Sequence, residues 1–116
     1  MKAKIIFDAK ATLGEGPVWD AKSQTLYWID ILEKRIYAGT KVIVQLDQFI
    51  GCLAPRPNGN LLIALSGVEE FSSFVDFRAD SSQQTVLATA NKSATNRFND
   101  GKCDPAGRFI VGSMDM

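Results

Sequence analysis

The sequence predicts an all-β protein built from β-propeller blades. Short apolar runs alternate with polar turns rich in glycine, proline and asparagine, and no segment has the pattern of a long helix. A unit of strand, polar turn and strand occurs three times, around Asp20, Pro57 and Asp104, at spacings of 37 and 47 residues. Such units at intervals of roughly 40–50 residues are typical of propeller blades. The chain holds about two and a half of them, so we expect residues 1–116 to form one partial β-propeller.

The first elements are a short strand, a break and a hairpin. Ala3–Phe7 is apolar and β-branched and is predicted to be a strand, whereas the two glycines and the proline of Leu13–Pro17 are predicted to interrupt regular structure. Val18–Asp20 and Thr25–Ile31 follow as the two arms of a hairpin. The second arm is apolar on both faces, which is typical of a strand covered on both sides in a stack of sheets.

The middle of the chain contains two further hairpins. Arg35–Ala38 and Lys41–Leu46 lie on either side of Gly39-Thr40 and form one predicted pair. Cys52–Arg56 and Asn60–Leu65 form the other, around a turn that contains Asn58-Gly59. An Asn-Gly pair between apolar runs is the strongest short signal for a hairpin.

The later elements are less uniform. The apolar residues of Val68–Phe77 fit one face of a helix nearly as well as a strand, and the neighbouring strands favour a strand. Ser81–Gln84 is a predicted turn and Thr85–Thr89 a predicted strand. The turn Asp104–Gly107 is followed by a last apolar strand.

The charge balance excludes several classes of partner. The chain has 13 basic and 13 acidic residues and a formal net charge of zero, so we expect it to bind neither nucleic acid nor a membrane surface. Its apolar runs are too short to span a bilayer or to act as a signal peptide. We therefore expect a cytoplasmic protein.

The sequence contains no histidine and two isolated cysteines, Cys52 and Cys103. Without histidine there is no Ser-His-Asp triad in this chain, and a cysteine/histidine zinc site is not expected. Both cysteines are predicted to be buried structural thiols, because apolar or turn residues flank each of them. Any catalysis would then depend on carboxylates and a hard metal ion.

Two stretches carry candidate functional residues. Arg97, Asn99 and Asp100 place a guanidinium, a carboxamide and a carboxylate within four residues, and alternation puts Arg97 and Asn99 on one face of an extended segment. Asp100 falls on the other face, with Phe98, and is therefore expected to be structural. A solvated loop before a hairpin is the alternative interpretation of this stretch. Glu15 lies between two glycines, which allow the backbone to bring its carboxylate close to a ligand.

Four motifs in order resemble the senescence-marker-protein/gluconolactonase family, which includes regucalcin and bacterial sugar lactonases. They extend from Leu13 to the last residue and are Leu13–Asp20 (LGEGPVWD), Leu26–Ile31 (LYWIDI), Ala54–Arg56 (APR) and Asn96–Phe109 (NRFNDGKCDPAGRF). The resemblance implies the first blades of a six-bladed propeller that hydrolyses aldonolactones such as gluconolactone. It also implies a divalent cation, variously calcium, zinc, magnesium or manganese.

The resemblance assigns roles to three residues. Glu15 matches a metal-ligand carboxylate, and Arg97 and Asn99 match the pair that contacts the sugar lactone. Oxygen ligands in a site without histidine suit a hard cation such as calcium or magnesium. A cation of this kind would polarise the lactone carbonyl and lower the pKa of a bound water.

The resemblance also leaves part of the site unassigned. The family completes its metal site with an asparagine and an aspartate from later blades, and the aspartate is its proposed general base. Both are expected beyond Met116, so the catalytic base is unknown in this chain. Since one carboxylate binds a divalent cation weakly, the chain alone need not retain the metal and is expected to be inactive. The alternative is a non-catalytic β-domain or a self-assembling propeller fragment that associates through exposed sheet edges.

Overall fold

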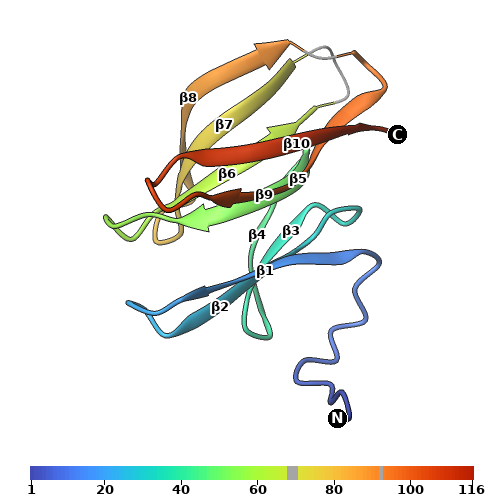
Figure 1. Ribbon diagram of the computed structural model, residues 1–116, viewed down its shortest axis with the longest axis vertical. Coiled ribbons are helices and arrows are strands. Elements are labelled where there is room, and N and C mark those ends of the chain that lie inside the picture. The colour runs from blue at the N-terminus through green and yellow to red at the C-terminus, as the bar shows by residue number, and fades with distance from the viewer. Residues whose placement is uncertain (68–70, 92) are drawn as a thin grey trace.

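The computed structural model of the protein describes residues 1–67, 71–91 and 93–116. In this part of the chain there are ten β-strands and no helix, which confirms the all-β prediction (Figure 1). The strands are β1 (Gly14–Asp20), β2 (Thr25–Asp30), β3 (Arg35–Ala38), β4 (Lys41–Gln45), β5 (Phe49–Pro55), β6 (Leu61–Ser66), β7 (Phe71–Arg78), β8 (Gln83–Asn91), β9 (Asn96–Cys103) and β10 (Phe109–Asp115).

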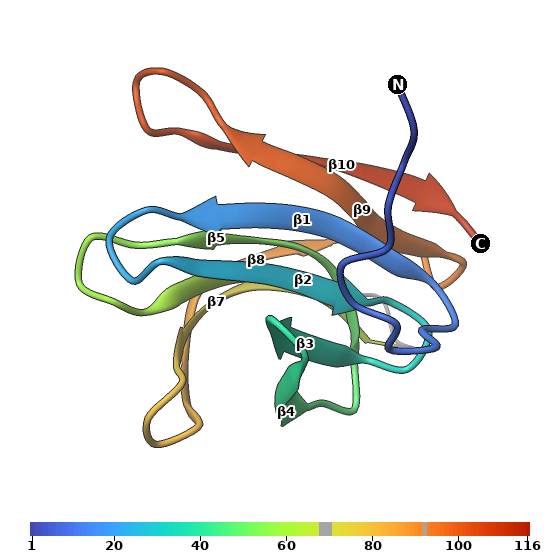
Figure 2. The ribbon, with the colours of Figure 1, turned by 90° about the horizontal axis from the view of Figure 1, so that it is seen from below.

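The strands form three antiparallel sheets in chain order. The first sheet has the order β1-β2-β3-β4, the second β5-β6-β7-β8, and the third pairs β9 with β10. Each four-stranded sheet is a simple meander, as in a propeller blade. The first strands of the three sheets, β1, β5 and β9, lie near one another (Figure 2), and β5 contacts both β1 and β9. Two complete blades and one half-blade agree with the prediction from the sequence.

Local turn chemistry accounts for the tight hairpins. Between β5 and β6, the Gly59 backbone has φ = 86°, a conformation that favours glycine. The Gly59 N–H donates to the Arg56 carbonyl at 3.0 Å, and the Asn58 side-chain oxygen accepts from the Asn60 N–H at 3.0 Å. The turn therefore fixes the register of the hairpin, as the Asn-Gly signal predicted.

A hydrophobic core joins the first two sheets. Its fully buried members include Ile29 and Ile36 from the first sheet and Ile50, Ile63 and Phe77 from the second. Burial of each such side chain contributes about 1.5–3 kcal/mol. This core holds β1 and β5 in place beside each other.

A smaller cluster joins the second and third sheets. Phe98 of β9 packs on Cys52 and Ala64, and the Phe74 ring lies 4.9 Å from the Phe98 ring and 6.2 Å from the Phe109 ring, centroid to centroid. Because β10 is the one sheet neighbour of β9 within the described ranges, this aromatic contact fixes the position of β9 against the second sheet.

Two predictions for the N-terminal part were wrong. Ala3–Phe7 is not a strand: Ile5 and Ile6 are exposed, and this segment pairs with no strand of the described chain. A strand needs a partner as well as β propensity, and this segment only lies beside Leu26 and Trp28 around a shallow hollow. Conversely, Leu13–Pro17 does not end regular structure, since β1 begins at Gly14 and accommodates Gly16 and Pro17 as an irregularity.

The ambiguous segment Val68–Phe77 is a strand over Phe71–Phe77, and residues 68–70 lie outside the described residues. The strand predicted over Thr85–Thr89 is longer, Gln83–Asn91. Nowhere in the described ranges does the chain form a helix that could cross a membrane.

Candidate functional site

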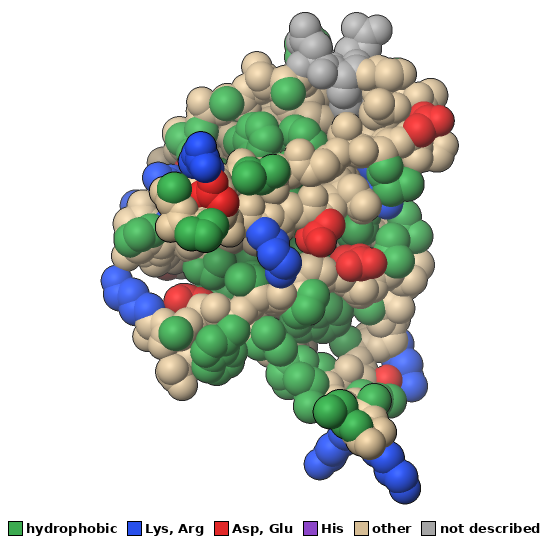
Figure 3. All heavy atoms as spheres, viewed as in Figure 1, with side chains coloured by type: hydrophobic (Ala, Val, Ile, Leu, Met, Phe, Trp, Pro, Cys, Tyr) green, Lys and Arg blue, Asp and Glu red, His purple; other side chains and the backbone are tan. Residues whose placement is uncertain are grey.

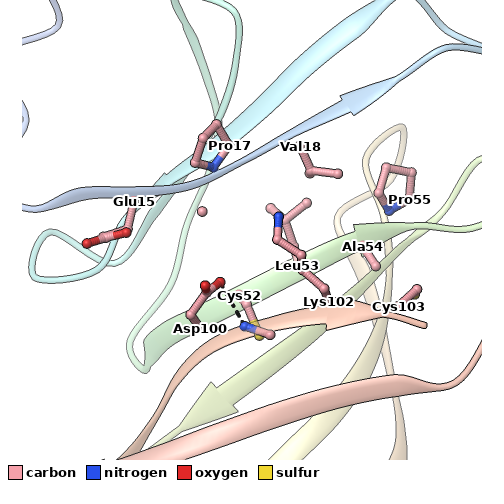
Figure 4. A pocket seen from close by; sticks show the side chains of 12 residues that line it. Glu15, Pro17, Val18, Cys52, Leu53, Ala54, Pro55, Asp100, Lys102 and Cys103 are labelled. Carbon is pink, nitrogen blue, oxygen red and sulfur yellow. Dashed lines mark hydrogen bonds between the residues drawn. The ribbon is translucent and has the colours of Figure 1, made fainter.

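The first strands of the three sheets enclose a hollow of about 380 Å³ (Figure 4). Each of the three strands contributes four consecutive residues to its wall. They are Glu15–Val18 from β1, Cys52–Pro55 from β5 and Asp100–Cys103 from β9. The hollow therefore lies where residues far apart in the sequence converge, the usual location of a small-molecule site.

Glu15 lies beside a bulge in β1. Glu15 pairs with Ile29 and Val18 with Tyr27, so Gly16 and Pro17 together lie opposite the single residue Trp28. Gly16 has φ = 57°, a left-handed conformation that favours glycine. A bulge turns the neighbouring side chains away from strict alternation, and Glu15 lies beside it at the edge of the hollow (Figure 4).

A buried carboxylate holds the chain just before Glu15. Asp30, which is fully buried at the end of β2, accepts hydrogen bonds from the backbone N–H groups of Thr12 at 2.7 Å and Leu13 at 3.0 Å. It also accepts from the Glu33 N–H at 3.2 Å. Three donors satisfy the carboxylate, so its burial is compatible with a stable fold.

Asp100 lines the same hollow from the opposite side. Gly101 pairs with Val111 and Phe98 with Ser113, so Asn99 and Asp100 together face Gly112 in a second bulge. One Asp100 oxygen accepts from the Gly101 N–H at 2.8 Å, and the carboxylate projects from β9 into the hollow (Figure 4). The carboxylate thus lies apart from the hydrogen-bonded Arg97–Asn99 pair, which does not line this hollow, and the structural role expected for Asp100 stays a prediction.

Arg97 and Asn99 are brought together, as predicted. The Arg97 side chain is buried, with 8% of its surface exposed, and its Nη1 donates to the Asn99 Oδ1 at 3.0 Å and to the Phe98 carbonyl at 3.0 Å. Among the described residues, Arg97 has no carboxylate partner. The pair does not line the hollow that Glu15 and Asp100 share. The described residues thus form two adjacent polar groups.

The two cysteines differ. Cys52 is buried beside the hollow, where burial and then the charge of Asp100 raise the pKa of its thiol to about 12. Cys103 is exposed, so the prediction that both are buried was wrong for this residue. It lies at the end of β9, next to the turn, and the half-blade leaves its side chain open to solvent.

The described side chains do not by themselves form a complete metal site. Within residues 1–67, 71–91 and 93–116, no three histidine, cysteine, aspartate or glutamate side chains cluster as ligands. Glu15 and Asp100 provide two carboxylates in the hollow. Calcium takes six to eight oxygens and magnesium six, so further oxygen ligands would have to complete a cation site here.

Residues 13–116 match the SMP-30/Gluconolactonase/LRE-like region as a family. The chain is 35% identical to regucalcin of Danio rerio over its whole length and covers 39% of that protein. It is 32% identical to 6-deoxy-6-sulfogluconolactonase of Pseudomonas putida, where the match covers 96% of this chain and 38% of the relative. It is 31% identical to a putative sugar lactone lactonase, YvrE, of Bacillus subtilis (strain 168), and covers 40% of it.

The fold agrees with this match. The structure of a luciferin-regenerating enzyme superposes with a TM-score of 0.67 at 27% identity and covers 91% of this chain and 37% of that one. The chain therefore spans about two fifths of the length of its relatives, and its three sheets are blades of their propeller-type fold. The chain belongs to the SMP-30/gluconolactonase/LRE-like family.

Proposed function

We propose that this chain forms the N-terminal blades of a metal-dependent sugar lactonase that hydrolyses aldonolactones such as gluconolactone. Two of its relatives are named as lactonases, one for a sulfogluconolactone and one for sugar lactones. The observation that carries the proposal is the buried Arg97 guanidinium, bonded to Asn99 but to no carboxylate in the described chain. A buried cation without a counter-charge is costly unless another group satisfies it, and the oxygens of a sugar lactone would do so.

The pair has suitable donors for such a ligand. Both Arg97 hydrogen bonds come from Nη1, so the donors on Nη2 and Nε are available to ligand oxygens in the planar arrangement of a guanidinium. Because the Asn99 Oδ1 already accepts from Arg97, its amide nitrogen is free to donate. Together they would bind neighbouring oxygens of the sugar ring or the lactone carbonyl.

Glu15 is the proposed cation ligand of this chain, and Asp100, which lines the same hollow, would add a second carboxylate. A bound divalent cation would supply Lewis-acid activation of the lactone. Since the described residues offer only these two carboxylates there, we expect weak cation binding and no appreciable turnover by the 116-residue chain alone. The general base is not assigned to any residue of this chain.

Calorimetric titration with gluconate, the stable hydrolysis product, tests the binding role. Gluconate should bind weakly to the wild type, and Arg97→Ala should abolish the heat. The exposed Arg108, which pairs with Asp104, provides a matched control, and Arg108→Ala should bind like the wild type. Loss of binding in both variants, or in neither, would count against the assignment.

Hydrolysis of gluconolactone tests the catalytic role. The rate with the chain should equal the buffer rate, with added calcium or zinc and with chelator. Chelator-sensitive turnover that disappears in Glu15→Ala would instead show that this chain assembles a complete site.

A non-catalytic, self-assembling fragment is the second candidate. It is favoured by the half-blade, since β10 has one unpaired edge and exposes Ile110 and Met114. Hydrophobic side chains also lie between charged ones on the face seen in Figure 3. Light scattering should then give a mass above the 12.7 kDa monomer that decreases in Ile110→Lys. A monomer mass at all concentrations would rule this candidate out.

A further inference from the structure

Two buried serine hydroxyls in the second sheet reach toward the third sheet. Ser66, at the end of β6, and Ser72, at the start of β7, are directly paired across the sheet. Both are fully buried, with 0% and 1% exposed surface, and their hydroxyl oxygens lie 2.9 Å apart. Buried hydroxyls cost free energy unless they are hydrogen-bonded, so this pair requires an explanation beyond packing.

The Ser66 hydroxyl binds the backbone of β9. The Phe98 N–H donates to the Ser66 Oγ at 2.7 Å, across 32 residues of sequence. Phe98 lies between Arg97 and Asn99, and β9 has a sheet neighbour on one side only. A side chain of the second sheet thus supplies a hydrogen bond that an adjacent strand would otherwise make.

Ser72 completes the arrangement. A hydroxyl can donate one hydrogen bond and accept two. While Ser66 accepts from Phe98, its contact with the Ser72 hydroxyl fixes the direction of its rotor, whichever of the two donates. The two hydroxyls therefore form a short chain that ends on the Phe98 amide.

Gly51 sets the distance between the strands at the same point. A Cβ atom at this position would lie 2.7 Å from the Phe98 carbonyl carbon and 2.8 Å from the Asn99 carbonyl oxygen. The β5 backbone is thus in direct contact with the β9 backbone. This contact sets the distance between β9 and β5, and the Ser66 hydrogen bond sets the position of β9 along the strand direction.

We propose that Ser66, oriented by Ser72, is a positioning residue for the Arg97–Asn99 pair. It holds the Phe98 amide so that the side chains on either side reach one another and face a common ligand. The identity of this ligand as a sugar lactone rests on the proposed function. The positioning depends only on the contacts of the ligand-free chain.

Nuclear magnetic resonance of the isotope-labelled chain tests this proposal without a ligand. In Ser66→Ala, hydrogen exchange at the Phe98 amide should accelerate by about tenfold or more, and the Arg97 Nε and Asn99 Nδ2 signals should shift. The exposed Ser23, in the first hairpin turn, is the matched control, and Ser23→Ala should leave these signals unchanged. Unchanged Phe98 exchange, or unmoved Arg97 and Asn99 signals, in Ser66→Ala would overturn the proposal.

A second Ser66 variant and a gluconate titration complete the test. If Ser66→Ala does not fold, Ser66→Cys keeps the buried volume, weakens the acceptor and is measured in the same way. A gluconate titration then separates the two proposals. Absence of binding to the wild type refutes sugar binding and leaves the exchange result to decide positioning. Binding that weakens by about tenfold in the Ser66 variant, at unchanged fold, supports both.

Discussion

Substitution of Gly51 by alanine tests whether the close contact between β5 and β9 is required for stability. The new methyl group would lie 2.7–2.8 Å from three atoms of Phe98 and Asn99, closer than real Cβ atoms approach their neighbours. Two of the three are backbone atoms, which cannot rotate away as a flexible side chain can. The strands β5 and β9 must therefore move apart, and this movement disturbs the packing of Phe98.

The loss of folding free energy follows from the effect of overpacking in other protein cores. Insertion of one carbon into a well-packed site costs about 1–3 kcal/mol, and the rigid backbone at Gly51 places the effect toward the upper end. Alanine in place of glycine also restricts the unfolded chain, which offsets about 0.4–1 kcal/mol. We expect Gly51→Ala to lower the free energy of unfolding by about 1–2.5 kcal/mol net.

Gly112→Ala is the matched control, because it makes the same chemical change on the neighbouring β10. A Cβ there has its nearest neighbour, the Asp100 carbonyl oxygen, at 3.7 Å, an ordinary contact. This variant should match or slightly exceed wild-type stability. Urea unfolding followed by tryptophan fluorescence gives both values, and a difference below about 0.5 kcal/mol between the two variants would refute the close-contact reasoning.

Three further predictions concern acid stability, thiol reactivity and the core. Although burial opposes it, the Arg56 hydrogen bond holds the pKa of Asp76 below its usual value of 3.8. This carboxylate therefore stabilises the fold above about pH 4, and the contribution is lost as the pH falls through the lowered pKa. Asp76→Asn should flatten the acid decline of the urea midpoint, and an unchanged decline would contradict this. Iodoacetamide at pH 8 should alkylate Cys103 of the native chain and spare Cys52. Burial raises the pKa of the Cys52 thiol to about 12 and so keeps it protonated. Equal labelling of the two cysteines by mass spectrometry would be inconsistent with the fold. Phe77→Ala should cost about 3–5 kcal/mol in urea unfolding, because Phe77 is fully buried in the main core, and a loss below 1 kcal/mol would be incompatible with that burial.

The hairpins could be predicted because their information is local. Asn58-Gly59 needs only a turn conformation and a few backbone hydrogen bonds, and the structure has them. The repeat of such units then predicts stacked sheets. The propensity of Ala3–Phe7 did not suffice to predict its structure, since a β-prone segment becomes a strand only when another strand pairs with it.

The candidate site could be predicted only in part. Arg97 and Asn99 were expected on one side of β9, and their hydrogen bond confirms it. That Asp100 lines a hollow could not be predicted, because its bulge and the nearby strands β1 and β5 are known only from the folded chain. Ser66 carried no signal for this role, since Ser66-Gly67 is typical of a turn that follows a strand and says nothing of a contact with β9.

Three irregularities in strand pairing lie on the first strands of the sheets, which also line the hollow. In each sheet the first pair of strands has a register shift: at Gly16-Pro17 in β1, at Gly51 in β5 and opposite Gly112 in β9. The β3–β4 and β7–β8 pairs are shifted as well, at residues that do not line the hollow. Regular pairing would point alternate side chains at the neighbouring sheets and leave few for the hollow between them. Each bulge breaks that alternation and frees a carboxylate or permits close approach, at the cost of ladder hydrogen bonds. The cores shared by the three sheets compensate for this cost. Substitutions in these cores, and at Gly51 where two backbones touch, should lower stability, whereas substitutions at the β1 and β9 bulges should act first on how Glu15 and Asp100 are presented.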